Sequence, residues 1–118
     1  MLEVSEKTTK KRACVLMQLG TRRQRYYFSQ DGTLSIGRTV GTKPGCVQLK
    51  GDKQVSGLHC KLWYDDRSGR FAVQNYSGNK TFTSQGILDK NQTAYLIKGE
   101  WIYVQTTKGR YIFYLEVE

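Results

Sequence analysis

Apolar and polar residues alternate along much of the chain, and elsewhere the apolar residues run in short blocks. From Tyr111 to Val117 every second residue is apolar, and residues 58–64 show the same alternation. A period of two residues is typical of a strand with one face in a core, and no stretch repeats apolar residues at helical spacing over three turns. The pattern predicts almost no helix. It predicts strands at residues 13–19, 25–29, 34–37, 46–49, 58–64, 70–74, 81–83, 94–97, 101–105 and 111–117.

Turn-forming residues separate these predicted strands. Asp, Gly, Pro and Ser occur at residues 30–32, 43–45, 65–69, 76–78 and 107–109, and these residue types favour tight turns. Many short strands at such spacing are typical of a sandwich or a barrel. We therefore expect an all-β domain over residues 13–118. Residues 1–12 have few apolar side chains and a basic cluster, so we expect them to form a flexible basic tail.

Length and charge narrow the classes of function. A chain of 118 residues suits one domain. Its 19 basic and 10 acidic side chains give a net charge of +9, which favours an anionic partner such as nucleic acid, an acidic membrane surface or a phosphorylated protein. No apolar run approaches the roughly 20 residues that a membrane helix needs, and residues 1–12 lack an apolar signal core. We therefore expect neither a membrane span nor export.

The residues that usually carry catalysis or bind metals are scarce. Cys14, Cys46 and Cys60 are odd in number and have no CxxC spacing, which argues against a disulfide scaffold and a zinc ribbon and favours a reducing compartment. His59 is the one histidine, which removes most enzymatic options, because a His-based triad or a multi-histidine metal site needs partners that this chain does not reliably supply. A Walker loop and a GxGxxG motif are also missing. The sequence therefore predicts a protein that is not an enzyme and that needs no metal or cofactor.

Three short motifs follow one another at intervals of about twenty residues. They are Ile36-Gly37-Arg38, then Ser56-Gly57-Leu58-His59, then Ser77-Gly78-Asn79-Lys80-Thr81. In this order, in an all-β chain of this length, they closely resemble the pattern of the forkhead-associated (FHA) domain, a reader of phosphothreonine peptides. The resemblance runs from about Ala13 to the C-terminus and includes residues 98–102, which look like the turn before the family's closing strand. It implies an FHA/SMAD-like β-sandwich of about ten or eleven mostly antiparallel strands.

The resemblance also implies a role for each motif residue. Arg38 would grip the phosphate, for which a guanidinium offers a planar fork of donors. Ser56 would donate its hydroxyl to the phosphate, and His59 would hold that loop from beneath by hydrogen bonding. Gly37 would let the backbone turn sharply beside the site. None of these roles is catalytic.

The third motif would contact the peptide. Asn79 would read its backbone, since an amide donates and accepts at once, and Thr81 would support the loop internally. Gly57 departs from the family, because many members have a basic or amide side chain there that adds a contact to the phosphate. Gly78 departs as well, because some members present a hydroxyl at that position. Lys80 replaces a glycine that is common between the asparagine and the threonine. We expect Lys53 or Lys80 to compensate as an additional phosphate ligand.

The expected function is therefore the recruitment of a partner that a kinase has phosphorylated on threonine, inside the cell and more in the nucleus than in the cytoplasm. Two alternatives stay open. Arg22, Arg23 and Arg25, in a predicted turn before an aromatic strand, would suit a basic β-barrel that binds nucleic acid, together with the N-terminal lysines. Gly57 and Gly78 would suit an FHA-fold scaffold that does not recognise phosphate.

Overall fold

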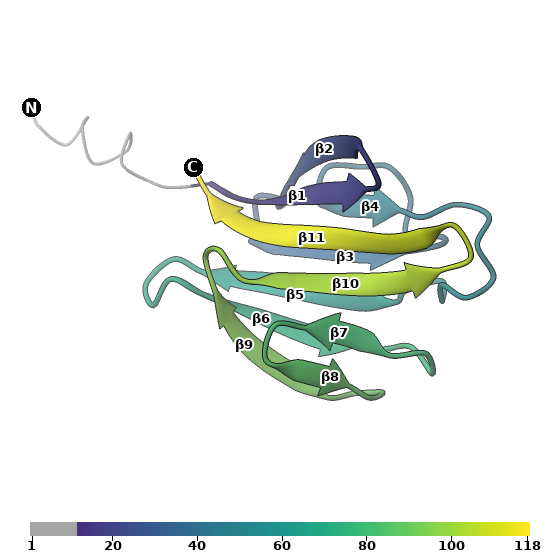
Figure 1. Ribbon diagram of the computed structural model, residues 1–118. Coiled ribbons are helices and arrows are strands. Elements are labelled where there is room, and N and C mark those ends of the chain that lie inside the picture. Colours follow the sequence, from purple (N-terminus) through teal and green to yellow (C-terminus); the bar gives the residue numbers. More distant parts are fainter. Residues whose placement is uncertain (1–11) are drawn as a thin grey trace, which may run out of the picture.

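The computed structural model describes residues 12–118. These residues form eleven strands in two sheets (Figure 1), which confirms the predicted β-sandwich. The predicted tail, apart from Arg12, lies outside the described residues. The strands are β1 (Ala13–Leu19), β2 (Arg22–Tyr27), β3 (Thr33–Gly37), β4 (Cys46–Gln48), β5 (Cys60–Asp65), β6 (Arg70–Asn75), β7 (Thr81–Thr83), β8 (Gly86–Leu88), β9 (Thr93–Ile97), β10 (Trp101–Thr106) and β11 (Gly109–Val117).

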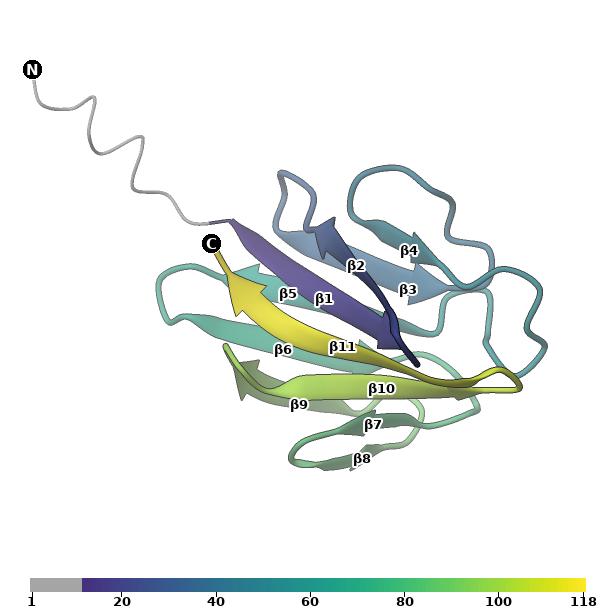
Figure 2. The ribbon, with the colours of Figure 1, turned by 45° about the horizontal axis from the view of Figure 1, so that its top comes forward.

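The two sheets lie face to face as separate layers (Figure 2). The six-stranded sheet has the order β2-β1-β11-β10-β7-β8, and the five-stranded sheet has the order β4-β3-β5-β6-β9. The pair of β3 and β4 is parallel, and the other pairs within residues 12–118 are antiparallel. Among these residues no helix is long and apolar enough to cross a membrane.

The core lies between the two sheets and consists mainly of alternate side chains of the longer strands. In the six-stranded sheet Val15 pairs with Leu115, and in the five-stranded sheet Leu62 pairs with Val73; all four are fully buried. The ring of Phe71 extends this core toward Phe28 and Tyr64. Burial of such apolar side chains is the main force that holds sheet on sheet.

The register of the five-stranded sheet brings three loops to one end of the sandwich. Ile36 lies opposite Cys60, and Cys60 lies opposite Asn75, so the three residues form one row across β3, β5 and β6. The loop after β3, the loop before β5 and the loop after β6 therefore all leave the sheet at this end. The C-terminus and the β5–β6 turn lie at the other end (Figure 1).

The structure corrects the prediction for the arginine-rich stretch. Arg22, Arg23 and Arg25 do not lie in a turn but in β2, which runs to Tyr27 and pairs with β1. The chain reverses earlier than predicted, over two residues that begin with Gly20 at a φ of +61°. Glycine adopts this left-handed conformation without a steric penalty, and two-residue hairpins of this kind need it.

Two further details differ from the sequence prediction. β8 was not predicted, because a three-residue strand that begins with Gly86 has too short a pattern to detect. The strand predicted at residues 58–64 begins at Cys60, and the Leu58 side chain is 38% exposed instead of lying in the core. The reason is that residues 56–58 fold over the end of β3, where the backbone of Gly57 contacts Gly37.

Candidate functional site

The loop after β3 and the loop before β5 are joined through their backbones. The N–H of Arg38 donates to the carbonyl of Ser56 at 2.9 Å, and the N–H of Thr39 donates to that of Gly57 at 3.1 Å. A Cβ at Gly37 would lie 2.1 Å from the Gly57 carbonyl oxygen, so only glycine permits this approach. The first two motifs are therefore held against each other by contacts that a larger residue at position 37 would prevent.

The Arg38 side chain lies on the surface above this junction. Its Nε donates to the carbonyl of Val55 at 3.0 Å, which fixes the direction of the guanidinium. Of its five N–H donors this contact uses one. No carboxylate of residues 12–118 lies within 4.0 Å of it. The remaining donors of Arg38 are thus available for an anion.

The hydroxyls of two serines connect the second motif to the third. Ser56 Oγ lies 2.6 Å from Ser77 Oγ, and Ser77 is almost fully buried. Ser77 Oγ also accepts a hydrogen bond from the N–H of Asn79 at 2.9 Å. The structure therefore brings Ser56 beside both Arg38 and the loop that follows β6.

His59 lies fully buried beneath these loops. Its Nδ1 accepts from the N–H of Ser56 at 3.3 Å, so the ring proton is on Nε2, which lies 3.3 Å from the carbonyl of Lys80. Burial lowers the pKa of His59 below its usual range, although the Lys80 carbonyl opposes this shift. A neutral imidazole with both nitrogens engaged holds the two loops together.

The remaining predicted residues lie around this junction. Asn79 is exposed and donates from Nδ2 to the carbonyl of Gln54 at 2.7 Å, which links the third loop to the second once more. The Lys80 ammonium forms an ion pair with Asp89, which offsets part of its charge. Lys53 is exposed in the turn next to Gln54. Thr81 is buried, and its hydroxyl bonds to Asn75 at 3.0 Å.

Sequence reasoning missed the role of Asn75. This residue is fully buried at the end of β6. Its Nδ2 lies within hydrogen-bond distance of the carbonyls of Ser77, Asn79 and Leu88, and its Oδ1 accepts from the N–H of Ser77 and the hydroxyl of Thr81. The one signal in the sequence was a polar residue at the end of a strand with an apolar face. Asn75 sets the shape of the third loop.

Asp52 was missed as well. It is 3% exposed, and its Oδ2 accepts from both the N–H and the hydroxyl of Thr107, each at 2.9 Å. Burial alone would raise the pKa of Asp52, but these bonds and one from the N–H of Gln54 outweigh burial and lower the pKa. Asp52 therefore ties the loop before β5 to the β10–β11 turn.

The basic and aromatic stretch in β2 is largely engaged with the protein. Arg25 forms an ion pair with Glu116 at 3.1 Å. Tyr26 packs against the core, and the hydroxyl of Tyr27 bonds to Glu118 at 2.8 Å. This strand lies at the edge of the six-stranded sheet and does not contribute to the junction of the three loops.

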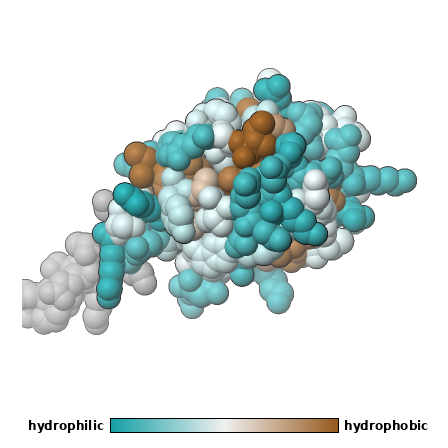
Figure 3. Space-filling model, turned by 90° about the horizontal axis from the view of Figure 1, so that it is seen from below, coloured by the Kyte–Doolittle hydropathy of each residue, from teal (hydrophilic) through white to brown (hydrophobic). Residues whose placement is uncertain are grey.

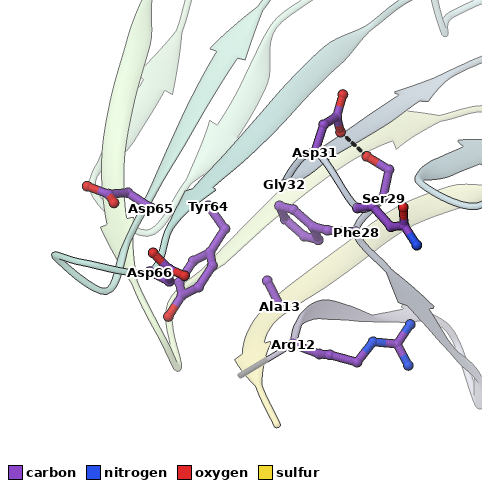
Figure 4. A pocket seen from close by; sticks show the side chains of 10 residues that line it. Arg12, Ala13, Phe28, Ser29, Asp31, Gly32, Tyr64, Asp65 and Asp66 are labelled. Carbon is purple, nitrogen blue, oxygen red and sulfur yellow. Dashed lines mark hydrogen bonds between the residues drawn. The ribbon is translucent and has the colours of Figure 1, made fainter. Parts of the chain in front are cut away.

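A cavity of about 740 Å³ lies at the opposite end of the sandwich (Figure 4). Phe28 and Tyr64 line it, together with Arg12 and the acidic residues Asp31, Asp65 and Asp66. Hydrogen bonds within the turn lower the pKa of Asp65, so it stays charged. The three carboxylates outnumber the one guanidinium of Arg12 and repel a phosphate, so this cavity is not a candidate for the predicted anion site.

Comparison with known proteins identifies relatives of the sequence. A family model described as FHA domain matches residues 34–104. The E3 ubiquitin-protein ligase CHFR of Xenopus tropicalis is 37% identical over 72 residues, which are 60% of this chain and 12% of the ligase. The corresponding ligase of Danio rerio is 38% identical over 66 residues, which are 55% of this chain and 10% of the ligase. The match thus spans about a tenth of these relatives.

Solved structures resemble the fold over almost the whole described chain. The MEK1 FHA domain has a TM-score of 0.69 at 20% identity, covering 90% of this chain and 89% of that one. The N-terminal FHA domain of S. cerevisiae Rad53p, solved with a phosphothreonine peptide, has a TM-score of 0.69 at 17% identity, covering 91% and 94%. At these identities the likeness concerns the fold.

Proposed function

This chain belongs to the FHA domain family, and from that premise we propose that its three joined loops bind a phosphothreonine-containing segment of a partner protein. The observation that carries the proposal is the guanidinium of Arg38, which bonds to the Val55 carbonyl and has no carboxylate of residues 12–118 within 4.0 Å. The next residue, Ser56, has its hydroxyl 2.6 Å from that of Ser77. A phosphate with a charge of about −1.5 to −2 is the anion that such a set of donors suits.

Arg38 supplies the charge of the proposed site. Its Nε is already bonded to the Val55 carbonyl, so the guanidinium keeps one orientation before the ligand arrives. Pre-orientation lowers the entropy lost on binding. The two terminal nitrogens then donate to phosphate oxygens as a fork, which a lysine cannot reproduce.

The hydroxyl of Ser56 is oriented for donation by its neighbours. Ser77 Oγ accepts from the N–H of Asn79, and in the proposed complex the Ser77 hydroxyl donates its own proton to Ser56 Oγ. Ser56 in turn donates its own proton outward, to the phosphate. Each hydroxyl then accepts one hydrogen bond and donates one, and successive bonds of this kind strengthen one another.

The other proposed roles follow from position. Asn79 uses one amide hydrogen for Gln54 and keeps its second hydrogen and its Oδ1 for the peptide backbone. Lys53 and Lys80 add positive charge at the rim. Gly37, His59 and Thr81 keep the loops in place and do not touch the ligand.

The proposed module recruits its partner and performs no chemistry of its own. The imidazole of His59 is buried with both nitrogens bonded, which supports binding as the role of this chain. The ligase activity of the relatives is not part of the proposal, because the match covers only about a tenth of them. We propose that recruitment follows a threonine kinase inside the cell, in the nucleus more than in the cytoplasm.

The test is binding of a degenerate phosphothreonine peptide library, followed by fluorescence anisotropy with the best peptide. Its phosphoserine and unmodified versions serve as competitors. Arg38→Ala removes charged hydrogen bonds to the phosphate and is expected to cost at least about 2 kcal/mol, or about 30-fold in Kd. The matched control is Arg67→Ala, which removes the same charge from the exposed β5–β6 turn at the opposite end.

The control variant is expected to bind as the parent does. A folded Arg38→Ala protein that binds the phosphopeptide as well as the parent would contradict the assigned site. Equal binding of the unmodified peptide would instead indicate a scaffold that does not recognise phosphate. Tight binding of single-stranded nucleic acid that falls steeply with salt and ignores Arg38→Ala would favour the nucleic-acid alternative.

A further inference from the structure

Exposed apolar side chains gather on one side of the sandwich, away from the three loops. Ile87 of β8 is 56% exposed, and Tyr95 and Ile97 of β9 are 61% and 56% exposed. β8 is the edge of the six-stranded sheet, and β9 is the edge of the five-stranded sheet. Seen from the side on which these strands lie, hydrophobic surface emerges in separate areas among hydrophilic side chains (Figure 3).

A groove of about 360 Å³ separates the two edges. One wall comes from Ile87 and Leu88 of β8, and the other from residues 93–95 of β9. The groove is therefore bounded on both sides by strands that lack a second neighbour within residues 12–118.

The backbone of β9 presents free hydrogen-bonding groups to this groove. In an antiparallel pair, alternate residues turn their N–H and C=O toward the partner strand. Because the carbonyl of Gln92 accepts from Asn75 of β6, the register turns Ala94 and Leu96 toward β6 and turns Thr93, Tyr95 and Ile97 outward.

The outward groups of Ile97 are already used. Its N–H donates to the Glu100 carboxylate at 2.8 Å, and its carbonyl accepts from the N–H of Glu100 at 3.0 Å. No residue of 12–118 bonds to the outward N–H of Thr93 or Tyr95. The open part of the edge therefore extends from Thr93 to Tyr95, next to the groove.

We propose that the β9 edge is a second binding site, which accepts an extended segment of another protein as an added strand. Such addition pairs backbone with backbone, and alternate side chains of the guest enter the groove. The segment is apolar at alternate positions and acidic at its ends, because the exposed Lys90 and Lys98 flank β9 and the domain carries a net charge of +9. The same charge opposes a second copy of this chain as the occupant.

The test uses a synthetic unphosphorylated peptide with the sequence Glu-Glu-Val-Thr-Val-Thr-Val-Glu-Glu, and amide hydrogen exchange followed by NMR. A peptide at ten times its Kd leaves about one molecule in eleven free, so exchange slows about tenfold at the amides it covers. The expected slowing is at Thr93 and Tyr95. The amides of Ala94 and Leu96, which already bond to β6, serve as internal controls.

Two variants distinguish pairing through the Tyr95 N–H from contacts of the Tyr95 side chain. Tyr95→Pro removes the outward N–H without removing a bond to β6, and it is expected to abolish the peptide effect. Tyr95→Ala keeps that N–H and is expected to retain slower exchange at position 95 on saturation. If Tyr95→Pro does not fold, the exchange pattern of the parent protein still tests the proposal.

The remaining outcomes are equally definite. Arg38→Ala is expected to leave the effect intact, because this site does not depend on phosphate. No slowing at Thr93 and Tyr95, or equal slowing at Ala94 and Leu96, would overturn the proposal. Slowing that depends on protein concentration without peptide would also overturn it, since it would identify a second copy as the occupant.

Discussion

The two ends of the sandwich close their loops in different ways. At the end that carries Arg38, loops distant in sequence bond to one another: residues 49–59 bond to residues 75–81 and to the β10–β11 turn. At the other end Ser84 and Gln85 of the β7–β8 turn bond to Glu100 in the β9–β10 turn, but the side chains of the two turns beside the cavity bond within their own turn. Asp65 accepts from the N–H of Arg67 and the hydroxyl of Ser68, and Asp31 bonds within the turn before β3.

The difference separates a binding surface from a simple chain reversal. The end with the cavity has three carboxylates beside that cavity, so its charge does not suit an anion. The end that carries Arg38 presents a guanidinium that no carboxylate of residues 12–118 neutralises. This guanidinium, held beside loops that bond to one another, identifies the site in this molecule.

The largest expected effect comes from breaking the contact between the first two loops. In Gly37→Ala the new Cβ would lie 2.1 Å from the Gly57 carbonyl oxygen, and backbone on both sides would have to move. We expect the free energy of unfolding to fall by about 3 kcal/mol, the upper part of the usual range for overpacking. Urea unfolding measures this loss, and phosphopeptide binding should weaken with it.

Gly78→Ala is the matched control, because nothing lies within 4 Å of a Cβ at that position. Its stability should stay within about 0.5 kcal/mol of the parent. If both variants were equally stable, the close approach of residues 37 and 57 would not exist in solution.

The next effect concerns the third loop. Asn75→Ala removes the buried amide and leaves the N–H of Ser77 and several carbonyls without their partner. Leaving buried polar groups unsatisfied should cost about 2 kcal/mol in the free energy of unfolding. The affinity for phosphopeptide should fall as well, because Asn79 and Ser77 lose their positions.

A turn at the other end provides the contrast. Asp65→Ala removes hydrogen bonds that stay within one turn, and we expect it to leave phosphopeptide binding unchanged. An equal loss of binding in both variants, measured by anisotropy, would mean that the two ends are coupled and that the comparison fails.

Much of the fold could be predicted because its signals are local. The alternation of apolar residues and the turn residues located ten of the eleven strands, although β2 began three residues before the predicted start. β2 was misplaced because the arginines at its start resemble a solvated turn. β8 was missed because its existence depends on pairing with β7 and not on its own three residues.

The candidate site was predictable only in part. Arg38, Ser56 and Asn79 stand in recognisable motifs at regular intervals. The roles of Asn75 and Asp52 depend on hydrogen bonds to residues that the fold brings close, such as Thr107, which lies 55 positions from Asp52. No pattern of neighbouring residues encodes such a partner.

A smaller effect follows from the buried imidazole. Burial lowers the pKa of His59 below the ordinary value of 6.5. Between the two pKa values the unfolded chain therefore binds a proton that the folded chain does not bind. The free energy of unfolding should therefore decrease as the pH falls below 6.5 toward the folded pKa, by up to about 1.4 kcal/mol per pH unit. Urea unfolding at several pH values between 7.5 and 5.5 measures this slope.

His59→Gln should lack this component of the slope, although it is less stable throughout. Asp52, whose pKa is lowered from 3.8, contributes stability that is lost only as the pH falls through its folded pKa, so it does not interfere. Identical slopes in parent and variant would show that His59 is not the group that titrates.

The smallest expected effect concerns the charges of Lys80 and Lys53 near the proposed phosphate site. Asp89 offsets the charge of Lys80 in an exposed ion pair, and such pairs contribute about 0.2–1 kcal/mol. Asp89→Asn should therefore tighten phosphopeptide binding about 1.4- to fivefold, and Lys80→Ala and Lys53→Ala should weaken it to a similar extent. Asp66→Asn changes the net charge equally at the opposite end, and should have no effect. Unchanged affinity in both lysine variants would remove them from the proposed site, because charge near a phosphate must alter its binding.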